Sequence, residues 1–361
     1  MTSSLRLARA PWRRAARPSV AVLAWSANGD RAGELARALG GEARCYYDLK
    51  IVDRRLVPVR YMLSAVRTLG YVVRRRPRAV VATNPPVVPG LIAWAYGRAT
   101  GARVVLDSHP SAFDPHVHAQ LARQLPVHRW LTPRVAATIV AGAHLEGVVR
   151  SWGGTPIVLH EAEPAWRVAP AGPPAQRPRI LAIGIFSYDE PVAEVLDAAR
   201  MLPGCDIALT GDLRRCPSDL RRHPPPNVRF TGYLRGEAYR AALEQADVIL
   251  SLTTRSEGAC RAAHEAVEAR RPLVASDWPT MRELFPHAVH VDNDAAAIAG
   301  GVRAALAHHA ELTAGADEAR AVQRARVAAQ LARLRAALEL PSARTDHPPG
   351  SAPPALARSA A

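Results

Sequence analysis

The chain has 361 residues, long for one hydrophobic core and natural for two domains, and its 48% hydrophobic content indicates a globular α/β protein. Its formal charge of +15 calls for an acidic partner: nucleic acid, an anionic membrane or a phosphorylated ligand. The four cysteines are scattered at no metal-ligand spacing, and prolines interrupt the most apolar run. The sequence therefore predicts a reduced, cytoplasmic protein without structural metal or a membrane span.

The amino-terminal end predicts a disordered basic segment, residues 1–17, followed by the first strand and helix of a nucleotide-type fold. Its arginines before an apolar run are also typical of a signal peptide, but residues 20–25 fit a strand that leads through SANGD into a helix at 31–39. Asn28 and Gly29 in that turn would let the backbone approach a ligand, although an ordinary tight turn explains them equally well. One glycine is no dinucleotide fingerprint, so no nicotinamide cofactor is predicted.

Residues 57–76 are predicted to form an amphipathic helix that carries apolar side chains beside five arginines. Such a helix can lie on anionic lipid, with each arginine contributing about 1 kcal/mol near the surface. An ordinary surface helix has the same pattern, so both interpretations stay open.

The next two predicted strands, 79–83 and 104–107, each end in polar residues, TNPP and DSHPSAF. Asp107 and His109 alternate along an extended chain and so share a face. A carboxylate beside an imidazole is the kind of pair that removes a proton from a hydroxyl group. Asp107 could instead cap the following turn, and His109 could be a loop histidine with ordinary partners.

The stretch NPPVVPGLIAWAYGRATGARVVLDSHP, residues 84–110, resembles the acceptor domain of polyprenol-linked sugar transferases, including the dolichol-chitobiose β-1,4-mannosyltransferases. In these proteins an Asn-Pro-Pro strand end is followed by an Asp-x-His strand end. The resemblance implies that Asn84 lies on the acceptor side, as Asn28 and Gly29 would, and that Asp107 and His109 are catalytic.

The rest of the chain alternates strands with helices on both sides of a proline-rich and alanine-rich linker, a pattern that indicates two doubly wound parallel sheets. The predicted strands are 136–142, 157–160, 180–185, 206–210, 228–231, 246–252 and 272–276, and the predicted helices include 143–153, 190–202, 236–246 and 316–338.

Residues 251–285 predict one β-α-β unit whose polar turn lies at the carboxyl end of a strand, where open α/β sheets bind ligands. Glu257 is predicted at the start of the helix and Glu265 two turns further in. Eight residues leave the two side chains about 80° apart around the axis, so both carboxylates can border one ligand. Alternatively, Glu257 only serves the helix dipole and Glu265 is a solvated helix residue.

The segment EGACRAAHEAV, followed by PLVASDWPTMREL, resembles the nucleotide-sugar-binding signature of the family 4 glycosyltransferases and their GT-B relatives. The residues that fall on its positions are Glu257, Glu265, Pro272, Val274, Asp277, Arg282 and Glu283. The resemblance implies a GT-B fold, in which two Rossmann-like domains face a cleft. It further implies that Glu257 is a catalytic residue near the donor sugar and that Glu265 bonds the nucleotide ribose.

The phosphate site departs from that family. Its members place a basic pair after the first glycine of the second domain, whereas Phe186, Ser187 and Tyr188 follow Gly184 here. A leaving diphosphate needs its charge stabilised, so an arginine must substitute, and we favour Arg255 over Arg261, Arg214 and Arg215. The implied donor-binding residues are Gly184, Ser187, Gly211, Gly232, Tyr233, Arg255, Gly258, Ala259 and Glu265.

A metal is not expected, and neither is another cofactor. Asp292-Asn293-Asp294 is formally the Asp-x-Asp of metal-dependent sugar transferases, but it precedes a helix, where Asp294 fits an N-cap.

These observations predict transfer of a sugar from a nucleoside-diphosphate donor to a glycan or polyprenyl-pyrophosphate-linked acceptor, in surface polysaccharide or glycolipid synthesis. An inverting reaction would use Asp107 as base, alone or with His109, and a retaining one needs no protein base. Two rivals are a catalytically inactive GT-B scaffold and a nucleic-acid-binding protein, although sparse aromatics and the lack of a motif speak against nucleic acid. The location expected is the cytoplasm, at the inner face of the membrane if the lipid interpretation of residues 57–76 holds.

The predicted divisions of the chain are a disordered segment (1–17), an acceptor-binding Rossmann-like domain (18–162), a linker (163–178), a nucleotide-sugar-binding Rossmann-like domain (179–312), a helix returning to the first domain (313–340) and a disordered tail (341–361).

Overall fold

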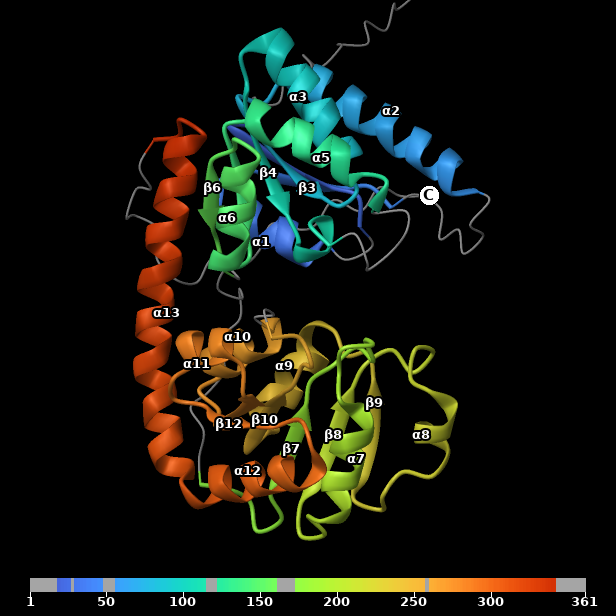
Figure 1. The fold of residues 1–361 in the computed structure, drawn as a ribbon, viewed down its shortest axis with the longest axis vertical. Coiled ribbons are helices and arrows are strands. Elements are labelled where there is room, and N and C mark those ends of the chain that lie inside the picture. Colours follow the sequence, from blue (N-terminus) through green and yellow to red (C-terminus); the bar gives the residue numbers. More distant parts are fainter. Residues whose placement is uncertain are drawn as a thin grey trace, which may run out of the picture.

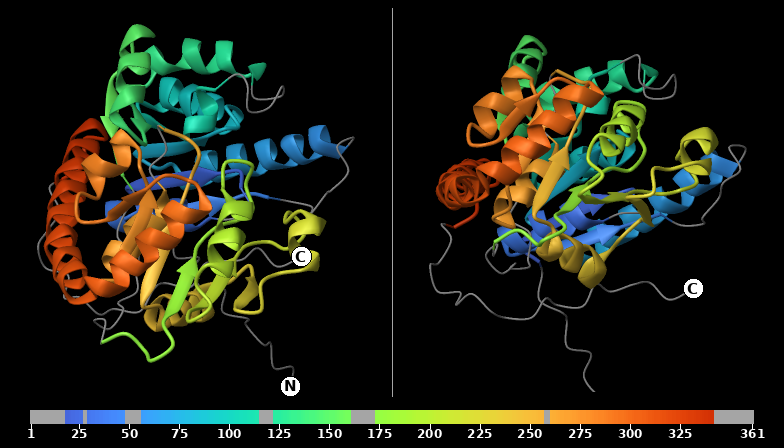
Figure 2. Two further views of the ribbon diagram at one scale, coloured as in Figure 1. Left: turned by 60° about the horizontal axis from the view of Figure 1, so that its bottom comes forward. Right: turned by 90° about the horizontal axis from the view of Figure 1, so that it is seen from below.

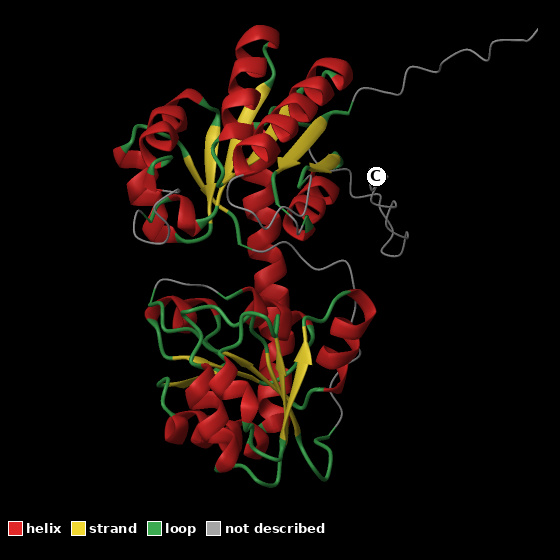
Figure 3. Ribbon diagram, turned by 90° about the vertical axis from the view of Figure 1, so that its right-hand side faces the viewer, coloured by secondary structure: helices red, strands yellow, loops and turns green. Residues whose placement is uncertain are grey.

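The computed structural model describes residues 18–26, 29–47, 56–114, 122–160, 173–256 and 260–341. These residues form two α/β domains, one above the other in Figure 1, with a long helix running beside both. Each domain has a parallel sheet of six strands with helices on both faces (Figure 3). Among the described residues, no helix has both the length and the apolar character needed to cross a bilayer.

The first sheet has the strand order β2-β1-β3-β4-β5-β6. Its strands are β1 (Val20–Ala24), β2 (Glu42–Cys45), β3 (Ala79–Asn84), β4 (Arg103–Ser108), β5 (Ala137–Val140) and β6 (Pro156–Val158). Its helices are α1 (Asp30–Leu39), α2 (Val57–Arg75), α3 (Val88–Thr100), α5 (Leu125–Leu131) and α6 (Ala143–Ser151), with single 3₁₀ turns at Pro110–Ala112 and Thr132–Arg134.

The second sheet has the order β12-β11-β10-β7-β8-β9, the arrangement of a Rossmann fold. Its strands are β7 (Arg179–Ala182), β8 (Asp206–Thr210), β9 (Val228–Gly232), β10 (Val248–Ser251), β11 (Leu273–Ser276) and β12 (Val289–Val291). Its helices are α7 (Val192–Arg200), α8 (Ser218–Arg222), α9 (Gly236–Gln245), α10 (Arg261–Glu268), α11 (Pro279–Leu284) and α12 (Ala295–Ala307).

Both faces of each sheet are buried, which explains why the strands are almost continuously apolar. In β1, Val20 and Val22 pack on the side of α1, whereas Ala21 and Leu23 pack toward α3. The two-residue period of a strand therefore fills a separate core on each face.

The long helix α13 (His309–Ala337) packs against both domains. Its carboxyl-terminal part places Leu334 in the core of the first domain. Further back, Arg320 and Arg324 both bond the buried carboxylate of Glu268 in α10, at 2.9 and 3.0 Å. The right-hand view of Figure 2, in which α13 is seen end-on, shows that this helix lies on one side of both domains.

The helix of the two-glutamate unit begins later than predicted. Cys260 has extended backbone angles, φ −78° and ψ 129°, and immediately precedes the first turn of α10 at Arg261. The prediction that a helix starts near Glu257 is therefore wrong, and no acidic residue lies in its first turn. Glu257, Gly258 and Ala259 lie outside the described residues.

Candidate functional site

The strand order of the second sheet reverses between β7 and β10, so the loops after these strands separate at the carboxyl edge, where such sheets bind ligands. The two loops meet through the backbone, because the Thr254 N–H donates to the Asp189 carbonyl oxygen at 2.8 Å. The loop after β8 reaches the same place through Thr210, whose hydroxyl lies 3.1 Å from both the N and the O of Gly184.

Two of the three predicted glycines at these strand ends have neighbours that leave no room for a side chain. A Cβ on Gly184 would lie 2.6 Å from a Glu190 carboxylate oxygen. A Cβ on Gly211 would lie 2.5 Å from the Phe186 ring, and Gly211 has φ +143°, which favours glycine. Gly232 has φ +76° with open space around it, and the half-exposed Tyr233 ring after it lies 4.9 Å from the Arg235 guanidinium.

The loop after β7 encloses a carboxylate that sequence reasoning missed. Glu190 accepts hydrogen bonds from the backbone N–H of Ile185 at 3.0 Å and of Ser187 at 3.2 Å. Burial raises the pKa of Glu190, and these N–H donors oppose that rise. The sequence offers no signal for this contact beyond the presence of Glu190 five residues after Ile185, because a carboxylate in a loop follows no periodic pattern.

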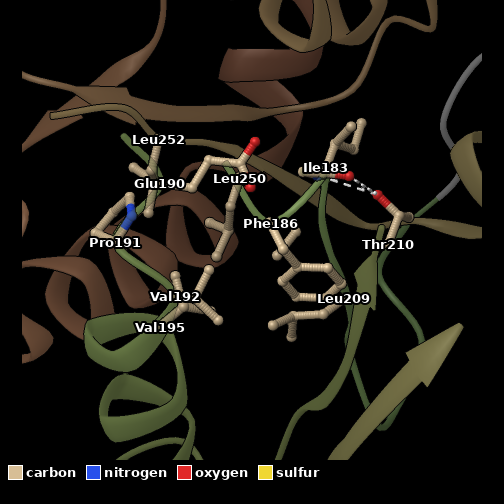
Figure 4. A pocket seen from close by; sticks show the side chains of 12 residues that line it. Ile183, Phe186, Glu190, Pro191, Val192, Val195, Leu209, Thr210, Leu250 and Leu252 are labelled. Carbon is tan, nitrogen blue, oxygen red and sulfur yellow. Dashed lines mark hydrogen bonds between the residues drawn. The ribbon is translucent and has the colours of Figure 1, made fainter. Parts of the chain in front are cut away.

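Figure 4 shows the hollow beneath this loop, lined by Phe186, Leu209, Leu250 and other apolar side chains. Its volume of about 30 Å³ has room for little more than a water molecule. The hollow is therefore a packing space under the loop and is too small to hold a nucleotide.

Arg255, the arginine favoured for the phosphate site, lies beside the loop after β7 and faces the first domain. Its guanidinium donates to the Tyr188 hydroxyl at 3.1 Å and lies 3.5 Å from the Asp114 carboxylate. Of the other candidates, Arg214 is 89% exposed and pairs with Asp212, beyond the end of β8.

Glu265 lies in α10 with its carboxylate fully engaged, and is buried rather than solvated. One oxygen accepts from Arg261 at 2.9 Å and the other from the Tyr239 hydroxyl. Burial, with the neighbouring Glu265 charge, raises the pKa of Tyr239 well above its usual range. Arg261 also bonds Glu34 of α1 at 2.7 Å, so one arginine joins Glu265 to the first domain.

In the first domain, Asp107 is buried and forms a bidentate ion pair with Arg31 of α1. Nε of Arg31 donates to one carboxylate oxygen and Nη2 to the other, each at 2.9 Å. His109 is exposed and turns to the following 3₁₀ turn, where its Nδ1 lies 3.1 Å from the Ser111 hydroxyl. Asp107 and His109 therefore each have a separate partner, and neither Arg31 nor Ser111 was foreseen.

Asn84 is buried, and its amide donates to the Ser108 hydroxyl at 3.2 Å. Ser108 in turn lies 3.0 Å from Nε2 of His128, a residue of α5 that no sequence pattern predicted. Burial lowers the pKa of His128 to about 4, so its imidazole is neutral at pH 7. This network holds the ends of β3 and β4 together.

Gly29 lies at the start of α1, where a Cβ would come within 2.5 Å of the Cys45 sulfur. The close approach of β2 therefore already accounts for this glycine. Asn28 lies outside the described residues.

Asp294 caps α12 as predicted, since its carboxylate accepts from the Ala297 N–H at 2.8 Å. Within the described part of the chain, no three His, Cys, Asp or Glu side chains gather as metal ligands would.

Residues 177–308 match the family model described as "Glycosyl transferases group 1". This range includes the whole second sheet, so the similarity to glycosyltransferases of group 1 lies in the second domain. No curated protein matches the chain in sequence.

Solved structures match both domains together. Sucrose-phosphate synthase from Thermosynechococcus elongatus has a TM-score of 0.70 at 16% identity, and Anabaena HepE in complex with UDP and glucose has 0.69 at 13%. A UDP-forming α,α-trehalose-phosphate synthase from Burkholderia xenovorans has 0.62 at 13%. Each match covers 89% of this chain and 99% of the other. The predicted GT-B fold is thereby confirmed, whereas the resemblances to family 4 and to dolichol-chitobiose mannosyltransferases stay predictions.

Proposed function

We propose that the protein is a glycosyltransferase whose second domain binds a nucleoside-diphosphate sugar and whose first domain binds the acceptor. The observation that carries this proposal is the convergence of the loops after β7, β8 and β10 at the switch point of a glycosyltransferase group 1 domain. Backbone at Gly184, Gly211 and Gly232 is proposed to line the nucleotide. Open space for it lies at Gly232, whereas the missing side chains of Gly184 and Gly211 make room for Glu190 and Phe186.

Arg255 is proposed to stabilise the charge of the departing diphosphate. The N–H donors of the loop after β7 are directed at Glu190, so this loop needs a positive side chain beside it to hold phosphate. Arg255 is next to that loop through Tyr188, and its ion pair with Asp114 is long and half-exposed. A pyrophosphate that takes the place of Asp114 would therefore cost little ion-pair energy.

Glu265 is proposed to bond the nucleotide ribose, with Glu257 near the donor sugar. Because Arg261 and Tyr239 already hold the Glu265 carboxylate, its direction is fixed before a ligand binds. Such preorganisation lowers the entropy lost on binding.

In the transfer, the bond from the sugar C1 to the leaving phosphate oxygen breaks, and C1 forms a bond to the acceptor hydroxyl oxygen. The hydroxyl proton must leave. In an inverting reaction Asp107, aligned by Arg31, would accept that proton, with His109 as a second candidate. In a retaining reaction the leaving phosphate can take it, and these residues would position the acceptor.

We further propose a glycan or polyprenyl-pyrophosphate-linked acceptor, a role in surface polysaccharide or glycolipid synthesis, and a place in the cytoplasm on the anionic inner face of the membrane. The net charge of +15 supports the lipid diphosphate and the anionic surface. The transferase is proposed to need no metal, so activity should persist in excess EDTA.

The test of the donor site is isothermal titration with UDP, the nucleotide bound in the Anabaena HepE structures. Arg255→Gln is expected to weaken binding about tenfold or more, since a hydrogen bond to a charged group contributes about 1.5–3 kcal/mol. Arg229→Gln, an exposed arginine of β9, is the matched control and should bind as the wild type does. If Arg214→Gln or Arg215→Gln weakens binding instead, the phosphate contact lies beyond β8.

Glu265→Ala separates an enzyme from an inactive scaffold. An enzyme should lose donor affinity and the release of UDP from UDP-sugars, whereas the exposed control Glu237→Ala should keep both. If no nucleoside diphosphate raises the melting temperature of the wild type, the donor-site proposal fails.

A further inference from the structure

The helix α2 presents its apolar side to solvent. Six of its large apolar side chains are between 38% and 65% exposed. They form the outward stripe, defined as Val59, Met62, Leu63, Val66, Leu69 and Val73. The spacing of three and four residues places them along one side of the helix. The helix lies on the outer side of the first domain, away from α13, in Figures 1 and 2.

The side of α2 that packs on the protein is partly polar, which reverses the usual arrangement of a surface helix. Its buried residues are Ser64, Thr68 and Val72. The Trp25 indole N–H donates to the Thr68 hydroxyl at 2.9 Å, and the Trp25 ring meets Tyr61 edge-on at 5.5 Å. These contacts fix the rotation of the helix, so the outward stripe cannot turn into the core.

One flank of the outward stripe carries a row of arginines, Arg60, Arg67 and Arg74, at seven-residue intervals. Seven residues are nearly two turns, so these arginines lie in line beside the stripe. The helix contains no acidic residue. Long arginine side chains beside an apolar face can reach polar headgroups while the face enters the acyl boundary.

The same flank borders an open hollow of about 670 Å³ between α2 and the end of β2. Its lining includes Arg44, Arg67, Arg74 and Arg75, together with Tyr46 and Tyr71. Glu42 bonds two of these arginines, Arg44 at 3.0 Å and Arg75 at 2.6 Å. The hollow therefore gathers four guanidinium groups beside the apolar stripe.

We propose that α2 is a membrane-docking surface, on which the outward stripe enters the interface of an anionic bilayer and the arginines of the adjoining hollow receive lipid phosphates. The spacing of three and four residues along the stripe would also allow it to pack against α2 of a second copy of the chain. Pairing two copies of α2, however, would bring arginine-rich helices together with no acid between them, whereas an anionic surface complements their charge. This proposal rests on the membrane location in the proposed function, and it names α2 as the surface that contacts the membrane.

The test is flotation of the full chain with vesicles of phosphatidylcholine alone or with phosphatidylglycerol added. Val66→Ser on α2 and Val322→Ser on α13 are matched, since the two valines are 65% and 58% exposed. Val66→Ser should lower the partition coefficient about tenfold, because two methyl groups that enter the bilayer are lost. Val322→Ser should leave it unchanged.

A second pair of variants tests the charge. Arg67→Gln with Arg74→Gln should weaken binding to anionic vesicles about thirtyfold. Arg326→Gln with Arg333→Gln removes the same charge from α13 and should change binding less than twofold. The wild type should bind neutral vesicles far more weakly and should leave anionic vesicles at high salt.

Equal effects of both pairs, or no binding to anionic vesicles, would overturn the proposal. Sedimentation velocity would identify the rival occupant: a dimer that Val66→Ser dissociates, without vesicle binding, assigns the stripe to a second copy. All variants should keep the wild-type affinity for UDP. Vesicle binding without any nucleotide binding would leave docking standing while the donor-site proposal falls.

Discussion

The buried histidine at the ends of β3 and β4 should make the stability of the protein depend on pH. Burial lowers the pKa of His128 to about 4, whereas a histidine in an unfolded chain titrates near about 6.5. Between these values the unfolded state binds more protons than the folded state. The free energy of unfolding is therefore at its full value above about pH 6.5 and falls as the pH drops toward about 4.

The difference of about 2.5 units in pKa corresponds to about 3 kcal/mol over the whole range, at about 1.4 kcal/mol per unit. Most of it should be visible between pH 7 and pH 5, where linkage gives a loss of about 2 kcal/mol. Burial also lowers the pKa of His287 to about 4, but this group titrates equally in the variants compared below and cancels.

The assay is urea unfolding at pH 7 and pH 5, followed by tryptophan fluorescence. His128→Gln keeps a polar side chain near Ser108 but cannot titrate, so its loss of stability between the two pH values should be about 2 kcal/mol smaller than that of the wild type. His223→Gln, an exposed histidine, should follow the wild type. An unchanged pH dependence in His128→Gln would refute the reasoning.

Three further substitutions should change stability in ways that urea unfolding can measure. Gly301→Ala should cost about 1–3 kcal/mol, because its Cβ would lie 2.4 Å from a valine side chain of β12, whereas Gly300→Ala meets open space and should gain up to about 1 kcal/mol. A similar cost for both would contradict the packing argument. Glu268→Gln should cost about 3 kcal/mol, since it leaves two arginines of α13 without their carboxylate, and a loss below about 1 kcal/mol would show that solvent replaces it. Thr210→Val should cost about 1–2 kcal/mol and weaken UDP binding, because the Gly184 N–H and carbonyl oxygen lose their hydroxyl partner, and unchanged UDP affinity would remove the loop after β8 from the donor site.

The alternation of apolar strands with helices was enough to predict two doubly wound sheets, because the pattern reflects burial on both faces of each strand. This pattern did not predict the shortest elements. Strand β2 has four residues, none of them fully buried, and α8 has five residues, so neither has a pattern long enough to recognise. The start of α10 was misplaced because a helix signal in sequence does not show where the preceding loop stays extended.

The site illustrates the same limit at the level of single side chains. Sequence pointed to Asp107 and Glu265, but not to the partners that hold them, Arg31 for the first and Arg261 with Tyr239 for the second. These partners come from distant parts of the chain, and only packing brings them within hydrogen-bonding distance. No spacing rule connects residues 76 positions apart.

For this protein, the sequence by itself determined the class of fold and the composition of α2, since both follow from local periodicity and residue type. The tertiary structure alone decided which side of α2 faces outward, because a hydrogen bond from Trp25, after β1, to Thr68 holds the helix in one rotation. It also decided that Arg261 joins Glu265 to Glu34 across the two domains. Long-range packing sets such orientations, and a periodic pattern reads the same whichever way its helix is turned.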